Sequence, residues 1–315
     1  MRFVFALALA AVACGAVAQP YPAKPVRILV PFPPGGTADL LTRLTAEKMS
    51  ASFGQQFVVE NRAGAGGNLA AEYVARAEPD GYTLLASPPH LLTINPLLYK
   101  LSFDPAKLAP VSIIAMYPNV LLAGPKLRAA SMQELIAQAR ERPGAIAIAS
   151  QGNGTLSHLA AELFKSMAKI DLLHVPYKGT APAMTDLLGG QVELIFDNLI
   201  TAMPHVKSGK LRLLGVGGER RIAAFPHVPA IAELLPGFRS ETWMALVAPP
   251  ATPSAITDKL SGAVRRAVNE PDFQHLLTEM QAEPVGNTPR EMAEVIRQET
   301  ERWSRVIRDA HITIQ

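Results

Sequence analysis

Two glycine-rich segments of this sequence have the residue types and spacing of anion-binding turns. Pro34-Gly35-Gly36-Thr37-Ala38-Asp39 follows a short β-rich run, and Ser150-Gln151-Gly152-Asn153-Gly154-Thr155 follows another. Each segment opens a stretch with helical periodicity, so it brings unpaired backbone N–H groups and the positive end of a helix dipole to one point. Glycine has no Cβ, and the backbone can therefore approach a ligand closely. These turns predict recognition of an anion, such as a carboxylate, by backbone donors.

The same segments also have purely structural interpretations. Thr37 can act as the N-cap of the helix that it precedes, and His158 can cap or pack instead of touching a ligand. The segment 61–67 is equally consistent with a surface loop and with a ligand-binding loop. Asp197 stands at the end of an expected strand, where it can accept a helix N–H or face the ligand, and we expect the ligand side. Tyr177 is expected in the wall of the site.

The usual enzyme motifs are missing from the sequence. Gly64-Ala65-Gly66 and Gly152-Asn153-Gly154 each lack the third glycine of a dinucleotide fingerprint, and neither a P-loop nor a Gly-x-Ser-x-Gly elbow occurs. The seven histidines have no metal-ligand spacing, so we expect neither a metal nor a cofactor. Catalytic sets are defined by geometry, so a hydrolase or transferase stays as the alternative. Its candidate bases and nucleophiles are His158 or His174, and Ser150 or Ser157.

Strands and helices alternate in two series that must position these turns. The first series has expected strands at 26–30, 57–60 and 82–86, and the second has strands at 145–149, 172–175, 192–196 and 211–216. Strands separated by helices predict an α/β fold with parallel sheets covered on both faces. If one turn comes from each series, the two turns face each other across a cleft. A late strand at 242–247 has no local partner, and Thr288 to Glu291 forms a capping box for a C-terminal helix.

Length and composition agree with two domains of ordinary size. The chain has 315 residues, of which 49% are hydrophobic and 18% are charged, and its formal net charge is +3. Disorder and coiled coils are therefore excluded, and no basic run is dense enough to predict nucleic-acid binding.

The N-terminus has the pattern of a secretory signal peptide. Arg2 precedes an apolar run, and Ala16-Val17-Ala18 is a cleavage pattern, so we expect residues 1–18 to be removed on export. Lipid anchoring at Cys14 is the alternative, although Ala11 stands where such signals usually carry leucine.

Several further motifs occur in order along the mature chain. They are Val30 to Asp39, Asn61 to Gly67, Pro79 to Leu84, Gly152 to Leu159, His174 to Gly179, Phe196 to Asn198 and Gly209 to Arg212. Together they resemble the Bug-type solute receptors of tripartite tricarboxylate transporters, a branch of the periplasmic binding proteins. Pro88-Pro89-His90 departs from the pattern in a loop that normally lines the ligand, which leaves the ligand's identity open.

The resemblance implies a two-domain Venus-flytrap receptor of type II. Two doubly wound domains would be joined by a two-crossing hinge, with domain 1 at 19–123 plus 240–315 and domain 2 at 124–239. The receptor would be a periplasmic monomer and not an enzyme, and it would hand a small organic carboxylate to membrane permease subunits. The turns and the resemblance together give these ligand-binding residues: Pro34, Gly35, Gly36, Thr37, Ala38, Asp39, Ala65, Ser87, His90, Ser150, Asn153, Gly154, Thr155, His158, Tyr177, Gly179 and Asp197.

Overall fold

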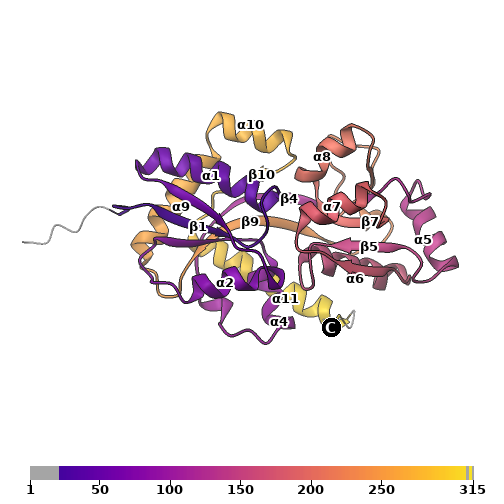
Figure 1. The fold of residues 1–315 in the computed structure, drawn as a ribbon, viewed down its shortest axis with the longest axis horizontal. Helices are drawn as coiled ribbons and strands as arrows, with labels where there is room; N and C mark the ends of the chain where they lie inside the picture. The colour runs from indigo at the N-terminus through magenta and orange to yellow at the C-terminus, as the bar shows by residue number, and fades with distance from the viewer. Residues whose placement is uncertain (1–20, 310–311, 314–315) are drawn as a thin grey trace, which may run out of the picture.

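A computed structural model describes residues 21–309 and 312–313. The expected signal peptide at 1–18 lies outside the described residues. The chain forms two α/β lobes that share one long strand, so that all the strands belong to a single mixed sheet (Figure 1).

The first lobe is built on three parallel strands in the order β2-β1-β3, followed by an antiparallel β9. Helices cover both faces of this sheet, as expected, with α1, α9 and α10 above it and α2 and α11 below it in Figure 1. The strands are β1 (Val26–Val30), β2 (Phe57–Asn61), β3 (Thr83–Ser87), β9 (Glu241–Ala248) and the two-residue β10 (Glu283–Pro284). The helices are α1 (Thr37–Phe53), α2 (Asn68–Ala75), α3 (His90–Thr93), α4 (Asn95–Leu98), α9 (Ser254–Val268), α10 (Pro271–Glu279) and α11 (Pro289–Asp309).

The second lobe repeats the strand order of the first. Its parallel strands lie in the order β6-β5-β7, and an antiparallel strand again follows the third. Because both lobes start with the same 2-1-3 order, the two glycine-rich turns occupy equivalent places, directly after β1 and after β5. The elements of this lobe are α5 (Met132–Glu141), β5 (Ala147–Ser150), α6 (Leu156–Ala168), β6 (Leu173–Pro176), α7 (Thr180–Leu188), β7 (Leu194–Asn198), α8 (Leu199–Lys207) and β8 (Arg212–Val216).

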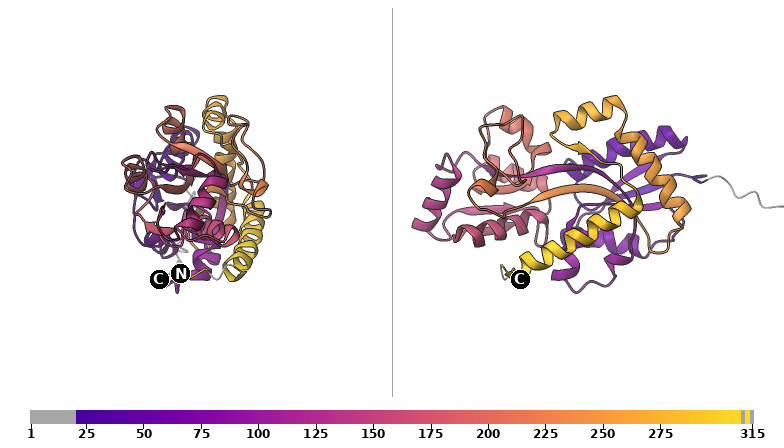
Figure 2. Two further views of the ribbon diagram at one scale, coloured as in Figure 1. Left: turned by 90° about the vertical axis from the view of Figure 1, so that its right-hand side faces the viewer. Right: turned by 180° about the vertical axis from the view of Figure 1, so that it is seen from behind.

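The long strand β4 (Ala109–Ala123) belongs to both lobes. Residues 109–118 pair with β9, and residues 119–123 pair with β7. Figure 2 shows β4 and β9 running together from one lobe toward the other, with α11 crossing beneath them. The late strand expected at 242–247 is β9, and its partners β3 and β4 lie far away in the sequence.

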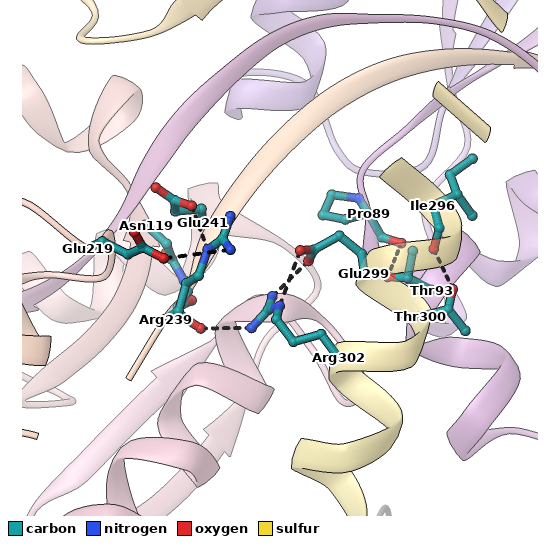
Figure 3. A network of polar contacts seen from close by, with 11 residues as sticks. Pro89, Thr93, Asn119, Glu219, Arg239, Glu241, Ile296, Glu299, Thr300 and Arg302 are labelled. Carbon is teal, nitrogen blue, oxygen red and sulfur yellow. Dashed lines mark hydrogen bonds and ion pairs between the residues drawn. The ribbon is translucent and has the colours of Figure 1, made fainter. Parts of the chain in front are cut away.

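A polar network fixes the second passage of the chain between the lobes (Figure 3). The Arg239 side chain donates to Glu241 at 2.8 Å, and its carbonyl oxygen accepts a hydrogen bond from Arg302 of α11 at 3.1 Å. Arg302 also pairs with Glu299 at 2.7 Å. The C-terminal helix is thus tied to the strand that returns to the first lobe.

Each lobe has its own apolar core on both faces of its sheet. Large buried side chains include Met49 and Trp243 in the first lobe and Phe164 and Phe196 in the second. A smaller cluster joins Trp303 of α11 to residues of α6 and of the segment before α4. Both tryptophans are therefore core residues, as hydrophobicity predicts. In residues 21–309 and 312–313 no helix is long and apolar enough to cross a membrane.

Candidate functional site

The N-termini of four helices meet in a hollow between the lobes, called the cleft below. Its walls include Gly36, Thr37 and Ala38 at the start of α1 and Leu156 and Ser157 at the start of α6. The other two helices contribute Thr180, the first residue of α7, and Asn198, the N-cap of α8. Each N-terminus carries unpaired N–H groups and about half a positive charge. The cleft is therefore built to receive a negative group.

Side chains add little charge to the cleft. Among the described residues that line it, none is Lys, Arg, Asp or Glu, and its titratable residues are His90 and Tyr117. Burial lowers the pKa of His90 to about 4 and raises the pKa of Tyr117, so both stay neutral near pH 7. The Nε2 atom of His90 lies 3.1 Å from the Gly66 carbonyl oxygen, which can only accept, so we assign the proton to Nε2.

Asp197 lies beneath the cleft and positions two of its lining side chains. Its Oδ1 accepts hydrogen bonds from Gln151 Nε2 at 2.5 Å, from Thr180 Oγ1 at 3.2 Å and from the Asn198 N–H at 2.7 Å. The residue is completely buried, and its Oδ2 has no partner among the described residues. Burial raises the pKa of Asp197 to about 6, against the lowering effect of these hydrogen bonds. Asp197 thus acts on the cleft through Gln151 and Thr180.

The first glycine-rich turn is brought to the cleft, although Thr37 is not the N-cap of α1. Gly36 occupies that position, and the buried Thr37 Oγ1 has no partner within the described part of the chain. Asp39 holds the turn from behind, because it accepts from the Gly35 N–H at 3.1 Å and from Arg43 at 2.9 Å. Arg43 and hydrogen bonds from Asn61 and Gly35 lower the pKa of Asp39 against the opposing effect of burial. Of the six residues expected here, Gly36, Thr37 and Ala38 line the cleft, whereas Pro34, Gly35 and Asp39 do not.

Residues of the second turn are divided between two places. Gln151 lines both the cleft and a neighbouring hollow, whereas Asn153 lines only that hollow, together with Ala65 and Tyr177. Thr155 is the N-cap of α6, and its Oγ1 accepts from the His158 N–H at 3.4 Å. His158 Nδ1 accepts from the Gly154 N–H at 3.2 Å. Neither Gly154, Thr155 nor His158 is in the cleft lining, so in this structure they shape the turn.

The other expected residues lie close to the cleft. His90 lines it, whereas Ser87 is completely buried and Ser150 lies beneath the second turn. Gly179 packs against the first turn, since a Cβ there would lie 3.1 Å from Pro33 Cδ, and its φ of +114° favours glycine.

The structure brings together one pair from the enzyme alternative. Ser150 Oγ and His174 Nε2 are 2.7 Å apart, and the His174 ring stacks on His158 at 4.3 Å. Ser150 is completely buried, however, and a substrate cannot reach it without a rearrangement. Ser157 does line the cleft, but its Oγ donates to the Phe196 carbonyl oxygen. In the described residues no group of three or more His, Cys, Asp and Glu side chains could hold a metal ion.

Sequence reasoning missed most of the side chains in the cleft walls. Gln151 and Thr180 each adjoin a residue that was singled out, so their local signal was present. The face that β4 and β9 present to the cleft had no such signal. The missed lining residues are Phe32, Pro33, Pro88, Tyr117, Asn119, Gln151, Leu156, Thr180, Asn198, Thr242 and Met244.

Two lobes of equal topology, one long strand shared between them and a cleft of helix N-termini define a two-domain solute-binding protein. Comparisons with known proteins agree with this class. The family described as "Tripartite tricarboxylate transporter family receptor" matches residues 41–312. BugT of Bordetella pertussis is 38% identical over 311 residues, covering 96% of this chain and 94% of BugT. The chain belongs to the tripartite tricarboxylate transporter receptor family.

Solved structures give the same result for the fold. An R. palustris protein with adipate has a TM-score of 0.90 at 38% identity, covering 93% of this chain and 99% of that one. MatC from Rhodopseudomonas palustris with bound malate has a TM-score of 0.88 at 33% identity, covering 91% and 100%. The family expected from the motifs and the α/β two-domain fold are both confirmed.

Proposed function

We propose that this protein is a periplasmic receptor that binds a small organic carboxylate in the cleft and delivers it to permease subunits of a tripartite tricarboxylate-type transporter. The observation that carries the proposal is the meeting of four helix N-termini in a cleft whose described lining has no charged side chain. Several N–H bonds to a charged oxygen, at roughly 1.5–3 kcal/mol each, supply the affinity. Relatives whose structures contain adipate and malate support a carboxylate as the ligand.

The receptor works as a monomer that closes on its ligand. Domain 1 comprises 19–123 plus 240–315 and domain 2 comprises 124–239, a division supported by the separate apolar cores. The passages at β4 and at 239–240 form the hinge. Export through the signal peptide at 1–18 places the receptor in the periplasm. The ligand leaves chemically unchanged, because in the pair Ser150 and His174 of the enzyme alternative the serine is completely buried.

A charge placed at the start of α1 tests the anion site. Gly36 has φ −89°, and a Cβ there would lie 3.7 Å from the Thr180 Cβ, so a side chain fits without backbone strain. We expect Gly36→Asp to fold, because Asp is a good N-cap. Its affinity for adipate and malate should be at least tenfold lower than that of Gly36→Asn. Asn has the same shape without the charge, so it is the matched control.

Isothermal titration of the wild type and both variants with adipate and malate measures this difference. Equal affinities of folded Gly36→Asp and Gly36→Asn would contradict the placement of the anion. Chromatography of the recovered ligand tests whether the protein changes it chemically. A new product made by the wild type and lost in His174→Ala would establish the enzyme alternative.

A further inference from the structure

One hydrogen bond joins the two lobes beside the cleft. The Tyr99 hydroxyl, which follows α4 of the first lobe, donates to the Asn153 carbonyl oxygen in the second glycine-rich turn at 2.7 Å. Burial raises the pKa of Tyr99, so its hydroxyl keeps the donated proton at physiological pH.

The lobes meet so closely at this contact that glycine is required on both sides. A Cβ on Gly66 of the first lobe would lie 2.9 Å from the Asn153 carbonyl oxygen. A Cβ on Gly154 of the second lobe would lie 2.5 Å from the Tyr99 ring. Both glycines also have positive φ, at +62° and +75°. The contact therefore forms only when the lobes are at the separation found here.

Both ends of the contact are linked to residues that line the cleft. On one side, the Gly66 carbonyl oxygen accepts the hydrogen bond from His90. On the other side, Asn153 belongs to the same turn as Gln151, which bonds to Thr180 at 2.9 Å and to Asp197. Tyr99 itself lies in the neighbouring hollow and is not in the cleft lining.

We propose that Tyr99 is a positioning residue that holds the closed receptor together and sets how long the ligand stays bound. This inference rests on the proposed function, because it assumes that the lobes close on a ligand. A contact made only in the closed state slows dissociation and leaves association unchanged, since association begins from the open state.

Tyr99→Phe tests the inference, because it removes the hydroxyl and keeps the ring. With adipate and malate as probes, stopped-flow kinetics of the mature chain should give a dissociation rate raised about fivefold, the effect of one neutral hydrogen bond, with the association rate unchanged. Tyr73→Phe is the matched control. Its hydroxyl accepts from Arg27 at 3.3 Å on the exposed side of the first lobe, and both of its rates should equal those of the wild type. An unchanged dissociation rate in Tyr99→Phe, or a slower association that accounts for the lost affinity, overturns the inference.

A distance measurement separates failure of the inference from failure of the proposed function. The only cysteine of the sequence is Cys14 in the expected signal peptide, so spin labels at Ala51→Cys and Lys207→Cys would be unique in the mature chain. Both sites are exposed, one in each lobe. Without ligand, a minor population of the wild type should be at the short, closed distance, and Tyr99→Phe should shift this population to the longer, open distance. If the wild type binds neither probe, the proposed function fails while this shift still supports the contact, and identical distance distributions contradict the contact.

Discussion

Three histidines in the interior, His90, His158 and His174, link the stability of the fold to pH. Burial lowers the pKa of His90 to about 4. Burial also lowers the pKa of His158, with Lys165 acting in the same direction. The pKa of His174 is lowered by burial, by His158 and by Lys165, against an opposing effect of Glu162. The unfolded chain protonates these residues near pH 6.5, so between pH 6.5 and 4 it binds more protons than the native state. Stability is therefore lost as pH falls through this window. Asp197 acts in the opposite sense, because its raised pKa of about 6 makes the native state bind the additional proton.

His90→Gln isolates one of these groups. The glutamine amide can still donate to the Gly66 carbonyl oxygen, but it does not titrate. The free energy of unfolding should fall between pH 7 and pH 4 in both proteins. The fall should be smaller in the variant, by up to about 3 kcal/mol, which corresponds to a pKa difference of about 2.5 units. Denaturant unfolding of ligand-free protein at both pH values measures the difference. His275→Gln on the surface is the control, and an equal pH effect in His90→Gln and the wild type would refute the assignment.

The helix α11 shows how a cap far from the cleft supports the hinge. Thr288 Oγ1 accepts from the Glu291 N–H at 3.2 Å, and the Thr288 N–H donates to the Glu291 carboxylate at 2.7 Å. The helix that begins there carries Arg302 to the Arg239 carbonyl oxygen (Figure 3). Its N-terminal capping box was predicted from sequence and is confirmed.

Thr288→Ala should lower the free energy of unfolding by about 1 kcal/mol, because it leaves the Glu291 N–H without its hydroxyl acceptor. For a chain of this size the melting temperature should fall by about 2–4 °C, which differential scanning calorimetry measures. Thr278→Ala is the control within α10, where the hydroxyl bonds the Gln274 carbonyl oxygen and does not cap the helix. Equal melting temperatures of Thr288→Ala and the wild type would show that the box contributes nothing.

At the scale of the whole molecule, the structure has its lobes in contact across the cleft. Phe32 and Pro33 of the first lobe lie within van der Waals reach of Gly179, and Gly36 faces Thr180. We therefore expect malate or adipate to make the protein more compact in small-angle scattering. Ligand at 100 times its dissociation constant should add about 2.7 kcal/mol of stability.

Scattering of the free and ligand-saturated protein measures this closure, with Gly36→Asp under the same conditions as the control that should not compact. Superimposable profiles of the free and saturated wild type would exclude a flytrap motion. The helical and strand content by circular dichroism should stay the same, since closure moves whole lobes.

Local sequence determined most of the elements and the two turns. Helix and strand periodicity, glycine positions and capping boxes act within a few residues, so each expected strand lies within a few residues of an observed one. The long strand β4 was not among the expected strands. The position of Gly36, Thr37 and Ala38 at a helix N-terminus follows from the same local rules. The motifs in order along the chain also identified the family.

Only the tertiary structure decided which side chains face the cleft. Tyr117 and Thr242 meet there because β4 pairs with β9 over more than a hundred residues of intervening chain, and no local pattern encodes that pairing. The same holds for Tyr99 and Asn153, which are distant in sequence and bonded in space. Long-range pairing and lobe packing depend on the burial of whole apolar faces, so individual partners across the cleft could not be inferred from spacing alone.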